Sequence, residues 1–128
     1  MQQMGKAVEA GPIDPKLREL IKVRVSQING CAFCLNMHTA DARALGETEQ
    51  RLYTLNAWRD TPYFSSKERA ALALAEEITR LPNQAVSQAV YDEAAEEFED
   101  EELAAVMAGA ILMNTWNRIS ISSGAEPR

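Results

Sequence analysis

The sequence predicts an all-α protein of about six helices. Apolar residues recur at helical spacing along most of the chain, and helix start and stop signals flank these stretches. No stretch of useful length alternates apolar and polar residues as a half-buried strand does. Alanine and leucine are abundant while aromatic residues make up only 6% of the chain, which favours packed helices over sheets.

The length of 128 residues predicts one domain that can bury a core of its own. Apolar residues make up 46% of the chain, well above the range of disordered proteins. Neither an internal repeat nor a linker divides the sequence. We therefore expect a single domain over residues 1–128, with its core between residues 15 and 121 and with flexible ends.

The first half of the chain carries signals for three helices. At Asp14-Pro15 an aspartate N-cap precedes a proline in the first helical position, and Asn29-Gly30 ends this helix. Gly46 is expected to be the left-handed cap of the second helix. Because two glycines and a proline interrupt residues 1–12, we expect a loose lead-in there. The predicted helices cover residues 15–29, 31–45 and 48–58.

The second half carries signals for three more helices. Ser65 and Glu68 have the spacing of a capping box. The last helix is apolar on more than one side, so we expect it to be buried on more than one side, in the monomer core or at a subunit interface. The acidic run 92–102 is expected to be a solvated surface, and the tail 122–128 to fray. The predicted helices cover residues 65–81, 87–97 and 100–121.

The charge balance limits the classes of partner. A net charge of −6 argues against nucleic-acid binding, because phosphate contacts need clustered lysine and arginine, and it disfavours an anionic membrane surface. No apolar run approaches the roughly 18 residues of a transmembrane helix, and residues 1–12 lack the shape of a signal peptide. We therefore predict a cytoplasmic protein, in which two cysteines indicate a catalytic, redox or metal-binding role rather than a structural disulfide.

Both cysteines and the only histidine lie close together in the sequence. Cys31 and Cys34 are one helical turn apart, at a Cα separation of roughly 5 Å that a disulfide can bridge. Cys34 and His38 share a helix face, so the imidazole can accept a thiol proton directly or through one water. The helix N-terminus also favours a thiolate. This spacing predicts thiol–disulfide exchange or peroxide reduction, in which one sulfur attacks and the other resolves.

Spacing alone leaves two alternatives open. The cysteines and histidine could bind zinc, although a closed site needs a fourth ligand from a carboxylate or a second subunit. They could also be inert structural residues. A thioredoxin-like motif would need a βαβ context, and a c-type haem site would need histidine where the chain has Leu35, so neither fits.

The residues around this motif resemble the AhpD-like alkylhydroperoxidase branch of the carboxymuconolactone decarboxylase family. The likeness covers residues 15–121, and its most specific part is the combination of Glu19, the Cys31–Cys34 pair and His38. The matching stretches are residues 17–34, 57–59, 65–69, 75–79 and 114–119.

The resemblance implies an AhpD-like helical fold that assembles as a homo-oligomer, a trimer or a hexamer. It implies a peroxidase acting on small hydroperoxides, in which Cys34 attacks the peroxide and Cys31 resolves the product. His38 and Glu19 would form a proton relay. Electrons would come from a dithiol such as dihydrolipoamide or from a protein carrier, and neither a metal nor a bound cofactor is needed.

Two positions qualify the resemblance. Glu19 could be a surface carboxylate paired with Lys22, but it shares a helix stripe with Val23 and Ser26 that can face the next helix. There it would raise the basicity of His38 and fix its tautomer. Phe33 stands between the cysteines, where well-studied peroxidases of the family can carry a histidine, and this difference predicts a lower turnover.

Two other functions are compatible with the family. One is a lactone decarboxylase or another non-redox activity that does not use the cysteine pair. The other is a non-enzymatic redox adaptor or sensor, which would pass reducing equivalents to a partner protein through a reversible Cys31–Cys34 disulfide.

Overall fold

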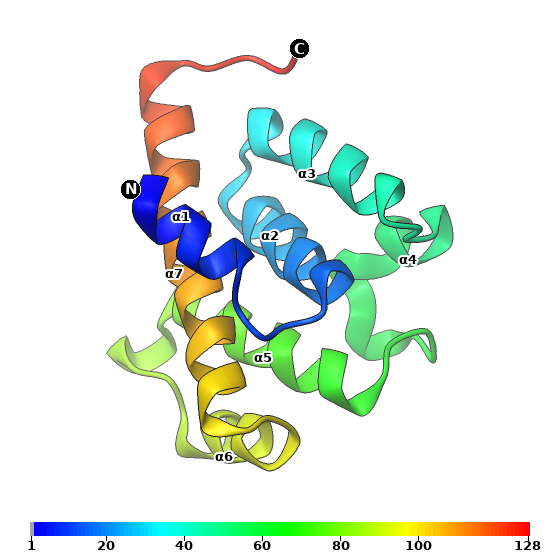
Figure 1. Ribbon diagram of the computed structural model, residues 1–128, viewed down its shortest axis with the longest axis vertical. Helices are drawn as coiled ribbons and strands as arrows, with labels where there is room; N and C mark the ends of the chain where they lie inside the picture. Colours follow the sequence, from blue (N-terminus) through cyan, green and yellow to red (C-terminus); the bar gives the residue numbers. More distant parts are fainter. Residues whose placement is uncertain (1) are drawn as a thin grey trace.

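The computed structural model describes residues 2–128 and consists of helices and their connections over that range (Figure 1). The α-helices are α1 (Gln2–Glu9), α2 (Pro15–Asn29), α3 (Ala32–Ala44), α4 (Glu49–Thr54), α5 (Ser66–Arg80), α6 (Gln88–Glu97) and α7 (Asp100–Ser123). Two short 3₁₀ helices are η1 (Leu55–Asp60) and η2 (Pro82–Gln84). The predicted all-α class is confirmed, with seven α-helices where about six were expected.

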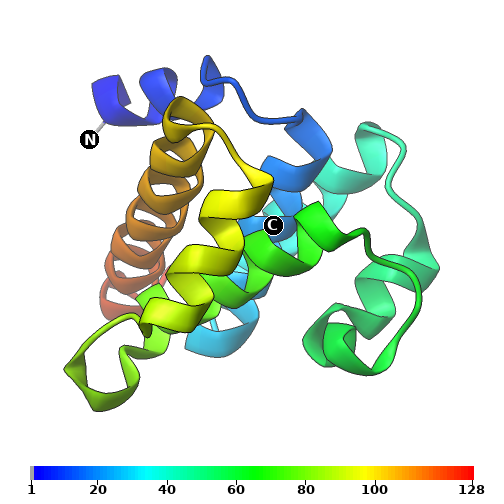
Figure 2. The same cartoon turned by 90° about the horizontal axis from the view of Figure 1, so that it is seen from below.

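Helix α2 lies at the centre of the bundle. It packs against α3, α5 and α7, and Figures 1 and 2 show these helices around it. Every residue from 17 to 26 is buried, including four that carry charge. A helix buried on all sides must pair its charged side chains inside the protein. The buried charges of α2 must therefore find their partners on the neighbouring helices.

Residues 1–12 were predicted to lack a helix, and this prediction is wrong for the described residues 2–9, which form α1. Contacts with the rest of the fold hold this helix despite its glycine. Val8 is buried near Gly109 of α7, and Glu9 forms ion pairs with Arg18 and Lys22 of α2. Tertiary packing thus outweighs the weak helix propensity of Gly5.

The strongest capping signals are confirmed. Asp14 accepts a hydrogen bond from the Lys16 backbone N–H, Gly30 is left-handed at φ 70°, and both halves of the Ser65–Glu68 capping box are present. The helix predicted over residues 48–58 is instead divided into α4 and η1. The chain leaves helical geometry at Ala57 (φ −122°), beside the buried Trp58.

Helix α7 occupies a central position in the monomer. It packs against α1, α2 and α5, which confirms its expected burial on more than one side. It ends at Ser123 with Gly124 as a left-handed cap, so the predicted fraying from residue 122 starts two residues too early. Ile111 is 51% exposed on its outer side. A subunit interface on that side stays a prediction.

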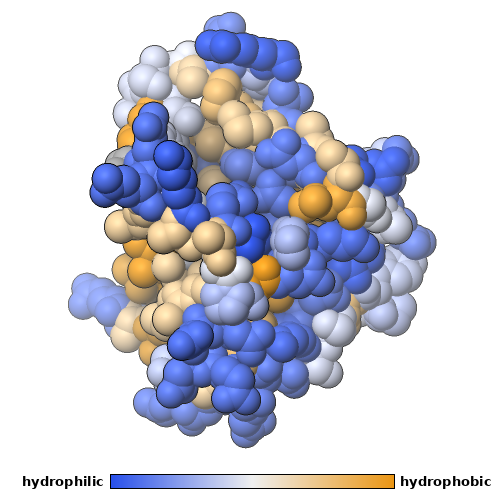
Figure 3. All heavy atoms as spheres, viewed as in Figure 1, coloured by the Kyte–Doolittle hydropathy of each residue, from blue (hydrophilic) through white to orange (hydrophobic). Residues whose placement is uncertain are grey.

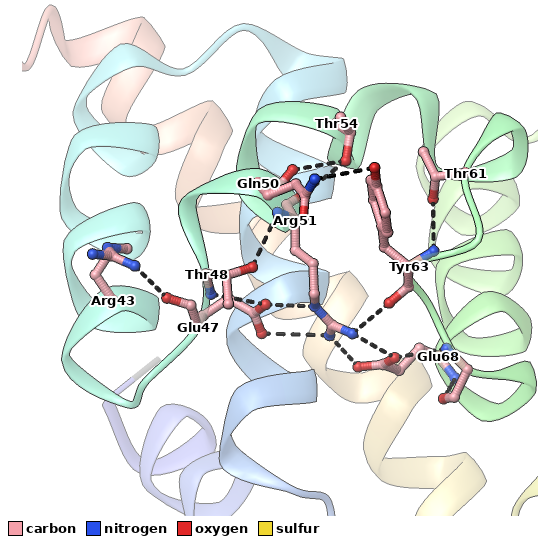
Figure 4. Close-up of polar contacts among 10 residues, drawn as sticks. Arg43, Glu47, Thr48, Gln50, Arg51, Thr54, Thr61, Tyr63 and Glu68 are labelled. Carbon is pink, nitrogen blue, oxygen red and sulfur yellow. Dashed lines mark hydrogen bonds and ion pairs between the residues drawn. The ribbon is translucent and has the colours of Figure 1, made fainter.

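An ion-pair network around the buried Glu47 fixes the segment after α3 (Figure 4). Glu47, only 2% exposed, accepts a hydrogen bond from Arg51 Nε at 2.6 Å. Arg51 also pairs with Glu68 and donates to the Tyr63 carbonyl at 2.7 Å. These contacts join the start of α4 to the start of α5, on the opposite side of α2 from α7.

Within residues 2–128, no helix is both long and apolar enough to cross a membrane.

Candidate active site

The corner between α2 and α3 brings the cysteines together. The left-handed Gly30 reverses the chain, and its N–H and that of Cys31 both donate to the Ser26 carbonyl. Cys31 then takes the N-cap position of α3, where its sulfur accepts the Cys34 backbone N–H at 3.4 Å. The two thiols consequently lie within the first turn of α3, as the spacing predicts.

The two cysteines are free and buried. Cys31 is 1% and Cys34 is 4% exposed, and their Sγ atoms lie 2.7 Å apart. Burial raises the pKa of the Cys34 thiol, and the hydrogen bond with Cys31 adds to the increase, while contacts with Ser120 and Asn117 of α7 lower it. The expected preference of this helix end for a thiolate is therefore not met at Cys34, because desolvation outweighs it.

His38 and Glu19 face each other across the α2–α3 interface. The distance from His38 Nδ1 to Glu19 Oε1 is 3.3 Å, and Asp41 Oδ2 lies 3.6 Å from the same nitrogen. Burial would raise the pKa of Glu19, but the hydrogen bond from His38 and the charge of Lys22 hold it below its usual range. An ionised carboxylate only accepts hydrogen bonds, so Nδ1 carries the proton and Nε2 is left as the acceptor.

Glu19 is buried at 5% exposure, so it is not the surface carboxylate of the alternative interpretation. The pairing with Lys22 that the alternative interpretation expected is present, because Lys22 Nζ lies 3.1 Å from Glu19 Oε2. This is an ion-pair distance without good hydrogen-bond geometry, and Oε2 has no hydrogen-bond partner among residues 2–128. Lys22 also pairs with Glu9, which connects the carboxylate to α1.

An apolar pocket of about 790 Å³ opens between α1, α3 and α7 and reaches both Cys34 and His38. Figure 3 shows that apolar side chains gather mainly over the α7 side of the molecule. A second depression, of about 570 Å³, is lined by His38, by Glu19 and by the exposed Asp41. His38 thus lines both the apolar pocket and this more polar depression. The apolar side chains lining the pocket include Phe33, Met37, Leu112, Met113, Trp116 and Ile119.

Among residues 2–128, one group of side chains could hold a metal ion. Ligand atoms of Glu19, His38 and Asp41 lie within 4.8 Å of one another. A cation there would compete with the Lys22 ammonium group, which already lies beside Glu19. Within residues 2–128 the cysteine sulfurs belong to no such group with His38, so the zinc set considered from spacing alone is not assembled.

Sequence reasoning missed the polar residues of α7 that reach the dithiol. Ser120 Oγ lies 3.7 Å from Cys34 Sγ, and Asn117 is fully buried nearby. They are 86 and 83 residues from Cys34 in sequence (120 − 34 and 117 − 34), so no local spacing connects them. The available signal was the presence of buried polar side chains on an otherwise apolar helix. Phe33 is partly buried against the main hydrophobic core and brings no polar group to the thiols.

A helical protein with a buried dithiol and an adjoining carboxylate–imidazole pair is the class that this fold and site define. Residues 1–77 match the carboxymuconolactone decarboxylase family. The chain is also 46% identical to an uncharacterised protein, YdfG of Bacillus subtilis (strain 168), over 97% of its own length and 84% of that protein. The chain belongs to the carboxymuconolactone decarboxylase family, and the resemblance is confirmed.

Solved structures support the AhpD-like fold. A protein of unknown function from Agrobacterium tumefaciens, suggested to be the antioxidant defence protein AhpD, superposes with a TM-score of 0.95 at 29% identity. The match covers 99% of this chain and 87% of that protein. An uncharacterised peroxidase-related protein from Silicibacter sp. TM1040 gives a TM-score of 0.88 at 25% identity, over 99% of this chain and 68% of that protein.

Proposed function

We propose that this protein is a cysteine-dependent hydroperoxide reductase. The observation that carries the proposal is that Cys34 of the buried dithiol and His38 of the imidazole–carboxylate pair line the same apolar pocket. The pocket volume of about 790 Å³ suits an organic molecule of moderate size. The names of the Agrobacterium and Silicibacter structures, antioxidant and peroxidase-related, support the same assignment.

The first step transfers oxygen to sulfur. Because burial raises the pKa of the Cys34 thiol, a base has to remove its proton, and His38 Nε2 is the acceptor available on that face of α3. The Cys34 thiolate attacks the terminal peroxide oxygen, so that an S–O bond forms as the O–O bond breaks. The proton held by His38 passes to the departing alkoxide, and an alcohol and a Cys34 sulfenic acid result. Glu19 stabilises the imidazolium formed in between.

The second step closes the disulfide. Cys31 sulfur attacks the sulfenic sulfur, its proton joins the departing hydroxide as water, and the Cys31–Cys34 bond forms. The 2.7 Å between the sulfurs means that this step needs little movement. A dithiol such as dihydrolipoamide, or a carrier protein, then reduces the disulfide by exchange. Overall, one hydroperoxide (ROOH) takes up two electrons and two protons and yields one alcohol (ROH) and one water.

The proposal also includes the cellular location and the oligomeric state of the protein. The protein would act in the cytoplasm as a homo-oligomer, a trimer or a hexamer, with the donor dithiol reaching Cys31 or Cys34 from outside. Phe33 adds no acid or base between the cysteines, so proton transfer would depend on His38 and Glu19. We therefore propose a slow rather than a fast peroxidase.

The test is the consumption of cumene hydroperoxide with dihydrolipoamide as donor. We expect Cys34→Ser to lower the rate about a hundredfold or more, because the attacking sulfur is lost. Cys31→Ser should allow one oxidation of Cys34 and then stop. Ser122→Ala, an exposed hydroxyl on α7, is the matched control and should behave as the wild type. Equal rates for wild type and Cys34→Ser would overturn the proposal.

One observation favours a second candidate function. Glu19, His38 and Asp41 form an acid–base cluster that needs no sulfur, and the family takes its name from a decarboxylase. A protein of this kind would convert a carboxymuconolactone by proton transfer and loss of carbon dioxide. Retained activity on such a lactone after both cysteines are replaced by serine would favour it over the peroxidase.

A further inference from the structure

The hydroxyl of Ser120 does not make the contact that is usual for its position. A serine or threonine inside a helix commonly donates to the carbonyl four residues earlier. Thr115 in the same helix does so, with its hydroxyl 3.1 Å from the Ile111 carbonyl. Within residues 2–128, the Ser120 hydroxyl instead has the Cys34 sulfur as its partner, at 3.7 Å.

A fully buried amide one turn away fixes this orientation. Asn117 Oδ1 accepts a hydrogen bond from Asn29 at 2.9 Å, and Asn117 Nδ2 donates to Ser26 Oγ at 3.0 Å. Both partners belong to α2, so these bonds set the rotation of α7 relative to α2. Because Ser120 follows Asn117 by three residues, it lies on the same face of α7.

The charged and titratable side chains near Cys34 come from α1, α2 and α3 and from the corner between α2 and α3. Cys31, at the α2–α3 corner, contacts Cys34 directly. The pocket itself is lined by His38 of α3, by Lys22 of α2, and by Lys6 and Glu9 of α1. Helix α7 brings no charged side chain to this pocket; its polar contributors are Ser120 and Ser123. In a site where burial disfavours a charged sulfur, a hydroxyl already in contact with that sulfur can offset part of the cost, in addition to the buried Asn117 amide.

We propose that Ser120 is a catalytic residue of this site, whose hydroxyl accepts the Cys34 S–H in the resting thiol and donates to the sulfur in the thiolate. The reversal needs only rotation of a hydroxyl hydrogen, since a hydroxyl is both donor and acceptor. This role adds no redox step: the bonds that form and break are those of the peroxide reduction described above. The inference rests on the proposed function for its role in turnover, but the hydrogen bond can be tested without any peroxide.

The test is the pH dependence of iodoacetamide alkylation of Cys34 in a Cys31→Ser background, which leaves one thiol. Ser120→Ala should raise the pKa of Cys34 by about half to one unit and slow alkylation at pH 7 about three- to tenfold. Ser120→Thr keeps the hydroxyl and should restore most of the rate. Ser122→Ala, whose hydroxyl donates to the Ile119 carbonyl, is the control and should change nothing.

Two results would overturn the inference. One is a Ser120→Ala titration that coincides with that of Ser122→Ala. The other is a Ser120→Thr protein as slow as Ser120→Ala, which would attribute the effect to packing. If the titration shifts as expected but the wild type consumes no peroxide, the contact stands and the proposed function fails. If the wild type is an active peroxidase and the titration does not move, only the role of Ser120 fails.

Discussion

Glu76 of α5 and Glu19 of α2 are both buried glutamates, 3% and 5% exposed, yet their surroundings differ. Glu76 accepts hydrogen bonds from Arg24 Nε at 2.7 Å, from Trp58 Nε1 at 3.1 Å, and from Arg59. Both of its oxygens are satisfied by donors that cannot readily give up a proton. Glu19 has one histidine, one lysine at ion-pair distance and an oxygen without a hydrogen bond.

The difference separates a carboxylate held in a fixed structural network from one that lies where the proposed proton relay needs it. Glu76 joins α5 to α2 and η1 and does not line the pocket that Cys34 and His38 line. Glu19 instead contacts an imidazole and an ammonium group, both of which can release a proton. A buried carboxylate with such partners, at the lining of a hollow, has the surroundings that the proposed proton relay needs.

The largest expected effect is on stability, in Glu76→Ala. Removal of this carboxylate leaves the Arg24 guanidinium buried without its charged partner, which costs about 3–5 kcal/mol. Urea denaturation measures this loss, with the exposed Glu96→Ala as control. Glu19→Ala should cost about 1 kcal/mol or less, because Lys22 keeps Glu9. Equal losses from the Glu19 and Glu76 variants would remove the distinction between the two carboxylates.

The next effect is on activity, in Glu19→Gln. The amide keeps the shape and can still accept from His38, but it cannot balance an imidazolium charge. We expect the rate of cumene hydroperoxide reduction to fall about 10- to 100-fold, with stability nearly unchanged. Glu96→Gln serves as control. A full rate in Glu19→Gln would show that the carboxylate is dispensable, whatever its burial.

A smaller effect is expected at the backbone that holds the thiols. Gly30 has φ 70°, and a Cβ there would meet no atom within 4 Å, so Gly30→Ala should cost about 1 kcal/mol through backbone strain alone. Since Gly30 places Cys31, we also expect slower disulfide formation. Gly46→Ala, at φ 92° on the far end of α3, should show a similar stability loss with normal disulfide kinetics. Equal kinetics in the two variants would contradict this role of the corner.

The smallest effect is on the pH dependence of stability. The folded-state pKa values of Glu19 and Glu76 both lie below the ordinary glutamate value of about 4.3, because partner charges and hydrogen bonds outweigh burial. Each therefore stabilises the fold above that pH, and the contribution is lost as pH falls through the folded pKa. Acid denaturation followed by circular dichroism should show a shallower loss below about pH 4 in Glu76→Gln and in Glu19→Gln. Acid denaturation profiles identical to that of the wild type in both variants would contradict this stabilising role of the two carboxylates.

Local chemistry decided what could be predicted of the fold. The ends of α2 and α5 followed from Asp14-Pro15, Gly30 and the Ser65–Glu68 pair, because each signal acts within one turn of helix. Helix α1 could not be predicted, since contacts with α2 and α7 hold it rather than its own sequence. The break at Ala57 likewise depends on where Trp58 finds its partner Glu76, 18 residues away.

The site was predictable to the extent that it is local. Cys31, Cys34 and His38 share one helix, and spacing placed them together. Glu19 was singled out by the resemblance, and the structure brings it to His38. Ser120 reaches Cys34 from the opposite end of the chain, a juxtaposition that only the packing of α7 on α3 creates.

The central claim is that the Cys31–Cys34 pair reduces a hydroperoxide and becomes a disulfide. The most direct measurement is the reaction of the reduced protein with one equivalent of cumene hydroperoxide, followed by thiol titration and peptide mass mapping. The account predicts loss of both thiols, one molecule of alcohol for each disulfide, and recovery of the thiols with dihydrolipoamide. Intact thiols and unconsumed peroxide, or oxidation confined to sites other than Cys31 and Cys34, would contradict it.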